Sequence, residues 1–240
     1  MTDRNTTDEA ASVLRWVLFD LNGTLVDPAV MAQPLGDSAA DEALVYDALD
    51  HAIEQAMVVT MTGSHAVFAD LLRAGLRRRL SLAGRDPALA DDALALVSTM
   101  PAFIDAPAAL ETLRGVGLEI GVLTQSSAEA ADTVLRFAGL RDRMTVVISA
   151  PESGAFKPDP WPYRMALERI GAAGEEVALV AAHWWDVAGA KRAGLRTGWV
   201  ARRDLFLPES VPEPDVRGRD LAEVAEGLAR LRDASGRSRW

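Results

Sequence analysis

Four short apolar runs, each followed by a polar turn and then a helical pattern, constrain the fold of this chain most strongly. The runs cover residues 16–19, 118–123, 145–148 and 177–181. Strands that alternate with helices of ordinary length form βαβ units, and such units assemble into a parallel sheet. We therefore predict an α/β fold with a Rossmann-like parallel sheet as its core.

The strand signal disappears between residues 28 and 105. Ala- and Leu-rich segments there carry apolar residues three and four positions apart, which is typical of helices. The segment 41–61 has one apolar face, formed by Leu44, Leu49, Ile53 and Met57. We predict an inserted helical cap at 28–105.

These assignments predict the organisation of the whole chain. The core would consist of residues 13–27 and 106–232. The two end segments, 1–12 and 233–240, lack periodicity and are predicted to be disordered.

Composition excludes several classes of function. With 35 acidic and 25 basic residues among 240, the surface field repels nucleic acid and anionic lipid. The chain has no cysteine, which excludes disulfides and thiolate chemistry. It also lacks an apolar stretch near the ~20 residues that span a bilayer. We expect a cytoplasmic protein with no nucleic-acid or membrane partner.

Asp20 ends the first apolar run and opens a polar turn. In open α/β sheets ligands bind beyond the carboxyl ends of the strands, so Asp20 is a candidate nucleophile. Gly23 lets the backbone bend closely around a ligand, and the Thr24 hydroxyl can tie the loop down as structural support. The alternative is an ordinary aspartate that caps a turn.

Two further segments suit a substrate carboxylate. Thr124 and Gln125 follow the second run and precede a helical pattern over 128–138, where hydroxyl and backbone N–H groups can bind an anion. Lys157 lies in a proline-punctuated turn and could keep Asp20 ionised while neutralising the substrate. Plain N-capping and a solvated lysine are the alternatives.

The run at 177–181 leads into His183, Trp184, Trp185 and Asp186. Their position at the carboxyl end of a strand favours pocket lining. Asp186, together with His183, is a candidate for positioning or activating a water molecule. Adjacent tryptophans that fill the core, and a satisfied buried histidine, are the alternatives.

Asp20, Thr124, Lys157 and Asp186, in this order, resemble the four motifs of the haloacid dehalogenase superfamily. The segments 156–159 and 182–190, with Tyr163, resemble its 2-haloacid dehalogenase branch. The resemblance implies that an aspartate attacks carbon 2 of a small carboxylic acid, that halide leaves, and that water hydrolyses the ester. It implies no cofactor, and a homodimer is one possible assembly. The substrate contacts it implies are Leu21, Asn22, Thr124, Gln125, Tyr163, Trp184 and Trp185.

Phosphatases of this superfamily carry a second aspartate two residues after the nucleophile and an acidic pair that binds magnesium. This chain has Asn22 and Ala182 at the corresponding places. Magnesium needs hard oxygen ligands in octahedral array, so we expect no metal site. A phosphatase and a noncatalytic binding module are the less favoured readings.

Dehalogenases of this branch place an arginine in the early cap helix to receive the halide. Aligning the chain to them puts Glu54 near that position, unless Glu54 is only a solvated helix residue. A carboxylate repels halide and suits a leaving group that is a protonated amine. The chain is similar to hydrolases that open the azetidine-2-carboxylate ring, and we expect that substrate, with 2-hydroxy-4-aminobutyrate as product. Dehalogenation of an (S)-2-haloacid is the alternative.

Overall fold

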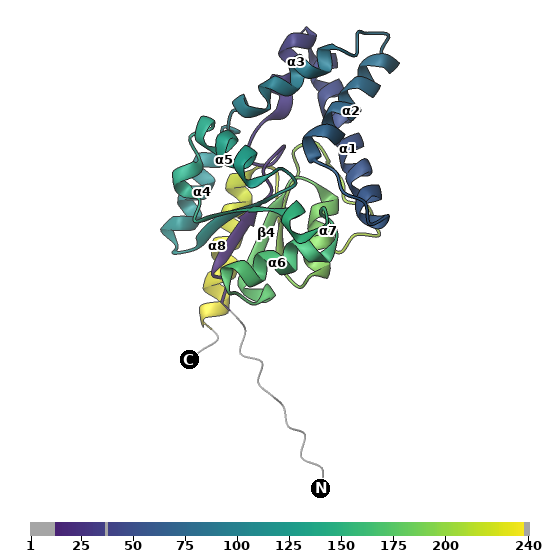
Figure 1. The fold of residues 1–240 in the computed structure, drawn as a ribbon. Coiled ribbons are helices and arrows are strands. Elements are labelled where there is room, and N and C mark those ends of the chain that lie inside the picture. Colours follow the sequence, from purple (N-terminus) through teal and green to yellow (C-terminus); the bar gives the residue numbers. More distant parts are fainter. Residues whose placement is uncertain (1–12, 37, 238–240) are drawn as a thin grey trace.

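The computed structural model describes residues 13–36 and 38–237. Its centre is a six-stranded sheet in the order β3-β2-β1-β4-β5-β6, in which every pair is parallel (Figure 1). The strands are β1 (Trp16–Phe19), β2 (Glu119–Thr124), β3 (Val146–Ser149), β4 (Val177–Ala181), β5 (Arg196–Val200) and β6 (Val216–Gly218). Every residue of β4 is buried, because helices cover both faces of a parallel sheet.

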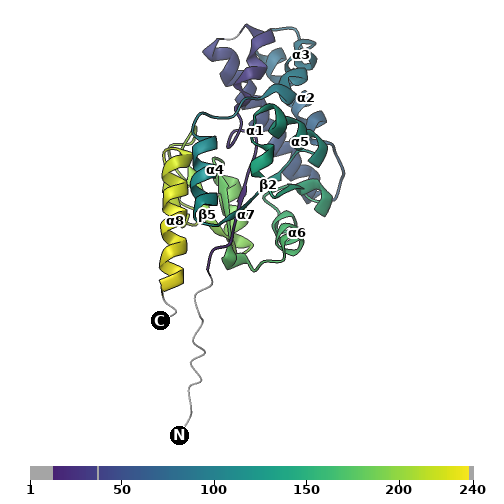
Figure 2. The same cartoon turned by 90° about the vertical axis from the view of Figure 1, so that its left-hand side faces the viewer.

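Figure 2 shows α4 and α8 on one face of the sheet and α6 on the other. The core helices are α4 (Ala106–Gly115), α5 (Ala128–Phe137), α6 (Pro160–Ile170), α7 (Trp184–Arg192) and α8 (Leu221–Arg237). Short 3₁₀ turns lie at η3 (Arg141–Arg143), η4 (Ala150–Ser153) and η5 (Gly174–Glu176). No described helix is both long and apolar enough to cross a membrane.

A helical cap lies beyond the carboxyl ends of the strands (Figure 1). It contains η1 (Pro28–Leu35), α1 (Ala39–Met61), α2 (Phe68–Leu82), α3 (Leu89–Ala95) and η2 (Leu96–Thr99). Helix α1 begins at a capping box, in which the Ser38 hydroxyl accepts from Asp41 N–H and the Asp41 carboxylate accepts from Ser38 N–H.

Helix α1 packs against α2 through small side chains. Its buried positions include Val45, Ala48, Ala52 and Ala56. The backbones approach so closely that a Cβ on Gly75 would lie 2.4 Å from the Ala48 carbonyl oxygen. Of the predicted apolar face, Ile53 is buried, and Leu44, Leu49 and Met57 are partly buried and pack against the core.

The two chain segments that enter and leave the cap run side by side. Val26 and Ala102 form an antiparallel bridge. Arg202, after β5, donates to the Thr24 carbonyl at 3.3 Å and to Asp105 Oδ1 at 2.7 Å. Its guanidinium lies 3.8 Å from the ring centroid of Phe103, so one core side chain joins both linkers.

The predicted parallel α/β core is confirmed, with strands at 16–19 and 177–181 and with the other two shifted by one residue. The sequence did not predict β5 and β6. The disordered segment predicted at 233–240 is wrong for 233–237, because α8 continues to Arg237. The prediction for 1–12 lies outside the described residues.

Candidate active site

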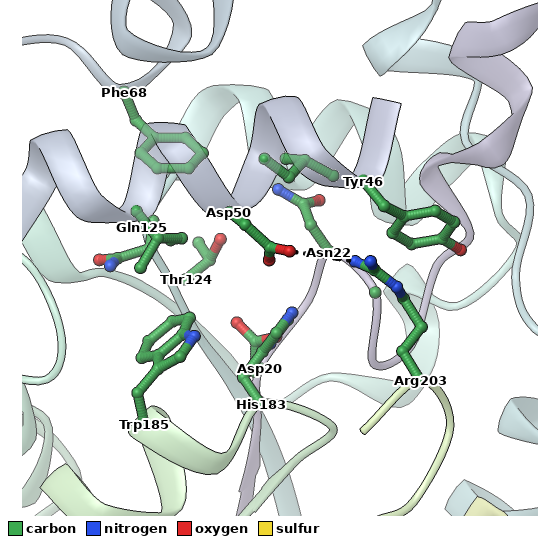
Figure 3. Close-up of a pocket in the computed structure, with 13 residues that line it drawn as sticks. Asp20, Asn22, Tyr46, Asp50, Phe68, Thr124, Gln125, His183, Trp185 and Arg203 are labelled. Atoms are coloured by element: carbon green, nitrogen blue, oxygen red, sulfur yellow. Dashed lines mark hydrogen bonds and ion pairs between the residues drawn. The ribbon is translucent and has the colours of Figure 1, made fainter. Parts of the chain in front are cut away.

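The carboxyl ends of the central strands bring four distant segments together at one edge of the sheet. Asp20 follows β1, Thr124 ends β2, Lys157 follows η4, and His183 follows β4. In parallel sheets this edge is the usual ligand crevice. Figure 3 shows Asp20 and His183 on the core side, with Asp50 of cap helix α1 opposite them.

Asp20 is 4% exposed and is held by three side chains. Its Oδ1 accepts from Lys157 Nζ at 2.9 Å, and its Oδ2 accepts from the Thr24 hydroxyl at 2.9 Å and lies 3.0 Å from His183 Nδ1. Burial alone would raise the pKa of Asp20, but Lys157 and His183 lower it well below its usual range. Asp20 is therefore ionised and oriented.

Lys157 is fully buried and has no donor left for a ligand. Its ammonium donates to Asp20 Oδ1, to the Leu123 carbonyl at 2.9 Å and to Asp186 Oδ2 at 2.5 Å. Three bonds use all three N–H donors of a lysine. Lys157 thus keeps Asp20 ionised, as predicted, but the predicted contact with a substrate carboxylate has no geometric basis here.

Gln125 fixes the backbone that carries this lysine. Its Oε1 accepts from Lys157 N–H at 3.0 Å, and its Nε2 donates to the Lys157 carbonyl at 2.8 Å. Gln125 and Thr124 both line the pocket next to Asp20, and their contact with a substrate carboxylate stays a prediction. Gln125 therefore holds the Lys157 backbone with both atoms of its amide, and its Nε2 keeps a second N–H donor.

Asp186 lies beneath the pocket and does not line it. It is fully buried, and its Oδ1 accepts from the Tyr163 hydroxyl at 2.7 Å. Burial raises the pKa of Tyr163 well above its usual value, and Asp186 adds to this effect, so Tyr163 remains a donor. Tyr163 therefore positions Asp186, and its predicted contact with substrate is wrong.

The reaction pocket is small, with a volume of about 30 Å³. One wall comes from a single face of α1, at the spacing i, i+3, i+4, i+7, and the other walls come from the strand ends, α2 and the loop after β5. The lining residues are Asp20, Asn22, Gly23, Tyr46, Leu49, Asp50, Ile53, Phe68, Thr124, Gln125, His183, Trp185 and Arg203.

His183 contacts Asp20 and also lines the pocket. Its ring stacks on Trp185 with centroids 5.1 Å apart. Burial lowers the pKa of His183, but Asp20 raises it further, and the net pKa lies above the usual value. Gly23, at φ +80°, lets the turn pass close to this ring: a Cβ there would lie 3.3 Å from Nε2.

Asp50, Tyr46 and Arg203 form a second charged cluster that the sequence analysis missed. Arg203 Nη1 lies 3.5 Å from Asp50 Oδ2, and its guanidinium lies 4.2 Å from the Tyr46 ring centroid. Both charged side chains are about half exposed, at 53% and 46%. Burial raises the pKa of Asp50, and Arg203 partly opposes this. Asp50 follows Leu49 and lies three residues before Ile53, so its place on the same helical face was the signal that could have indicated it.

The structure does not bring three other predicted contacts to the pocket. Glu54 is 73% exposed and pairs with His51 at 2.9 Å; it lies one turn along α1 from Asp50, outside the pocket lining. Trp184 is 37% exposed at the start of α7 and is not among the lining residues. The Leu21 side chain is fully buried in the core.

Metal ligands are sparse at this site. Among residues 13–36 and 38–237, no group of three or more His, Asp and Glu side chains could hold a metal ion. Lys157 lies between Asp20 and Asp186, and Ala182 supplies no ligand. This donor set does not fit magnesium, which needs several oxygen ligands.

Comparison with known proteins agrees with this geometry. Residues 14–194 match the haloacid dehalogenase-like hydrolases. The (S)-2-haloacid dehalogenase 4A of Burkholderia cepacia is 29% identical over 195 residues, which are 79% of this chain and 84% of that protein. A crystal structure of a dehalogenase with an intermediate complex has a TM-score of 0.83 and 26% identity, over 91% of this chain and 98% of that one.

Two other matches span only about half of each protein. An (S)-2-haloacid dehalogenase of Pseudomonas sp. (strain YL) is 30% identical over 124 residues, 52% of this chain and 53% of that protein. A phosphoserine phosphatase of Thermus thermophilus is 40% identical over 131 residues, 53% of this chain and 52% of that protein.

The parallel sheet, the cap and the buried aspartate define a capped α/β hydrolase. The chain belongs to the haloacid dehalogenase-like hydrolases. Within that family it is similar to the 2-haloacid dehalogenases.

Proposed function

We propose that the protein hydrolyses small carboxylic acids substituted at carbon 2, through an ester formed on Asp20. The observation that carries the proposal is that Asp20 is ionised, is oriented by three side chains and borders a pocket that Thr124 and Gln125 also line. A positioned carboxylate in such a pocket is suited to covalent catalysis. The hydroxyl of Thr124 and the amide of Gln125 would receive the substrate carboxylate.

In the first step an Asp20 oxygen attacks carbon 2. The new C–O bond forms as the bond to the leaving group breaks, and the leaving group departs with the electron pair. In the second step water attacks the Asp20 carbonyl carbon, and the product alcohol leaves with the original Asp20 oxygen. This restores a carboxylate that contains one oxygen from water.

His183 is the side chain best placed to accept the proton of that water. Asp186, the other candidate, has both oxygens engaged and does not line the pocket. The negative charge of Asp20 raises the pKa of His183. Ester formation removes that charge, so the pKa of His183 falls and its neutral form can act as the base.

Halide is the leaving group that the relatives support. In-line displacement expels the leaving group away from Asp20. On that side lie Asp50 of α1 and Arg203 of the loop after β5 (Figure 3). Arg203 supplies a cation on that side and could receive the halide. Several relatives are described as (S)-2-haloacid dehalogenases, and an (S)-2-haloacid is the substrate we propose first.

Asp50 favours a second candidate, the ring opening of azetidine-2-carboxylate. The carboxylate expected at Glu54 is supplied instead by Asp50, half exposed in the cleft opposite Asp20. It could stabilise a protonated ring nitrogen as the C2–N bond breaks. A phosphatase is disfavoured by Asn22 and Ala182, although one partial relative is a phosphoserine phosphatase.

The test incubates the protein separately with L-2-chloropropionate and with L-azetidine-2-carboxylate, and measures chloride and primary amine. Chloride release supports the dehalogenase. Amine release supports ring opening if Asp50→Asn reduces it and the matched control Glu54→Gln does not. A single turnover in heavy-oxygen water should place the label in Asp20. Label found only in the product, or full activity of Asp20→Asn, would overturn the ester mechanism.

A further inference from the structure

The reaction pocket is too small for its expected substrates and adjoins two larger cavities. Its 30 Å³ would hold about two water molecules, at ~10–15 Å³ each. One neighbouring cavity, of about 340 Å³, is lined by charged residues such as Arg203 and Asp204. The other, of about 160 Å³, lies between cap and core and shares Asn22 and Phe68 with the pocket.

The second of these cavities is lined mainly by hydrocarbon. Helix α2, the α3–η2 segment and the start of α5 form its walls, and none of its lining residues is charged. They are Asn22, Val67, Phe68, Ala69, Leu72, Leu94, Val97, Ser126, Ser127 and Ala130. A further cavity of about 390 Å³ shares Leu94, Val97, Ser127 and Ala130 with it and carries one charged residue, Glu129. We call these two connected cavities the apolar trough.

Side chains alone separate the apolar trough from the reaction pocket. Phe68 packs at a tilt on Phe156, with ring centroids 6.2 Å apart. Asn22 Nδ2 is 3.4 Å from the Ser126 hydroxyl, a long contact. Asn22 Oδ1 is buried and has no hydrogen-bond partner among the described residues. Asn22 and Phe68 line both spaces, so the reaction pocket and the apolar trough meet at these two side chains.

We infer that the apolar trough receives the alkyl chain of the substrate, so that the substrates include 2-substituted carboxylic acids longer than three carbons. The inference rests on the proposed function. Three walls differ in chemistry: Thr124 and Gln125 for the carboxylate, Asp50 and Arg203 for the leaving group, and Phe68 toward the trough for the chain. Carbon 2 of the substrate carries three groups that match these walls, namely the carboxylate, the leaving group and the alkyl chain, together with a hydrogen.

Chain length is the quantity to vary in the test. Each methylene buried from water should strengthen binding about fourfold, which is the fold-change equivalent of ~0.8 kcal/mol. We would measure kcat/KM for 2-chloropropionate, 2-chlorobutyrate and 2-chlorohexanoate. In parallel, calorimetry on Asp20→Asn would give affinities for acetate, butyrate and hexanoate, a measurement that needs no turnover.

Ala130→Phe would fill the trough from α5, and Leu94→Trp would fill it from the cap if the first variant does not fold. The matched control is Ala128→Phe, on the same helix and outside the lining of these cavities. We expect either filling variant to reduce the preference for hexanoate over acetate about tenfold or more, and the control to keep it.

The outcomes separate the two proposals. A graded affinity for alkanoates that Ala130→Phe abolishes supports the trough, even if no 2-chloro acid is turned over and the proposed function fails. Turnover of 2-chloropropionate together with equal affinity for acetate and hexanoate would overturn the trough and leave the proposed function standing. An unchanged chain-length preference in both filling variants would also overturn it.

Discussion

Replacing Lys157 by methionine should test the electrostatic arrangement of the site most directly. The ammonium is fully buried and joins two carboxylates, Asp20 at 2.9 Å and Asp186 at 2.5 Å. Methionine keeps much of the volume but removes the charge, which leaves two carboxylates in a site from which water is excluded. Removing one partner of a buried ion pair costs about 3–5 kcal/mol, so we expect Lys157→Met to lose that much unfolding free energy at pH 7.

The loss should depend on pH in a defined direction. Without the ammonium, burial and mutual repulsion raise the pKa of the two carboxyls above the unfolded value of about 3.9. The folded variant then binds more protons than the unfolded chain, so its stability falls as pH rises through the raised pKa. The difference from the parent protein should therefore be largest at pH 7 and should shrink toward pH 4.5.

The assay is urea denaturation followed by circular dichroism at several pH values. Lys191→Met is the matched control: Lys191 is 30% exposed, and its partner Asp215 keeps hydrogen bonds from Thr197, so a loss of about 0–1 kcal/mol is expected. Adding Asp186→Asn to Lys157→Met should recover about 1–2 kcal/mol, because one buried charge is gone. A loss below about 1 kcal/mol with no pH dependence would refute the reasoning.

Three further outcomes are expected. His183→Gln should slow ester hydrolysis more than ester formation, so mass spectrometry should find an adduct on Asp20; an adduct seen in Asp186→Asn but not in His183→Gln would assign the base to Asp186. EDTA should leave turnover unchanged, and strict dependence on magnesium would contradict the argument from Asn22 and Ala182. Gly75→Ala should lower the free energy of unfolding by about 1–3 kcal/mol, because its Cβ would lie 2.4 Å from a backbone oxygen of α1. The control Gly115→Ala, whose Cβ would have no atom within 4 Å, should not lower it. Equal urea-denaturation midpoints for the two variants would disprove the close packing.

The sequence determined the core and the place of Asp20 at the end of a core strand, because both depend on local pattern. A short, fully apolar run such as 177–181 between polar turns is typical of a buried strand, and a polar turn after such a strand lies at the ligand edge of a parallel sheet. Asp20, Thr124, Lys157 and Asp186 could be grouped from the sequence because, in this order, they resemble the four motifs of the haloacid dehalogenase superfamily. The strands β5 and β6 escaped because the first mixes Arg and Gly with apolar residues and the second has three residues.

Only the tertiary structure decided what these residues contact. Whether Lys157 reaches a substrate depends on how many acceptors surround its ammonium, and the fold supplies three. Which α1 carboxylate meets the pocket depends on how far along its axis the helix lies over the strand ends: Asp50 lines the pocket, whereas Glu54, one turn further along α1, pairs with His51 outside it. The position of a helix relative to the sheet is set by contacts between elements distant in sequence, and local periodicity does not encode those contacts.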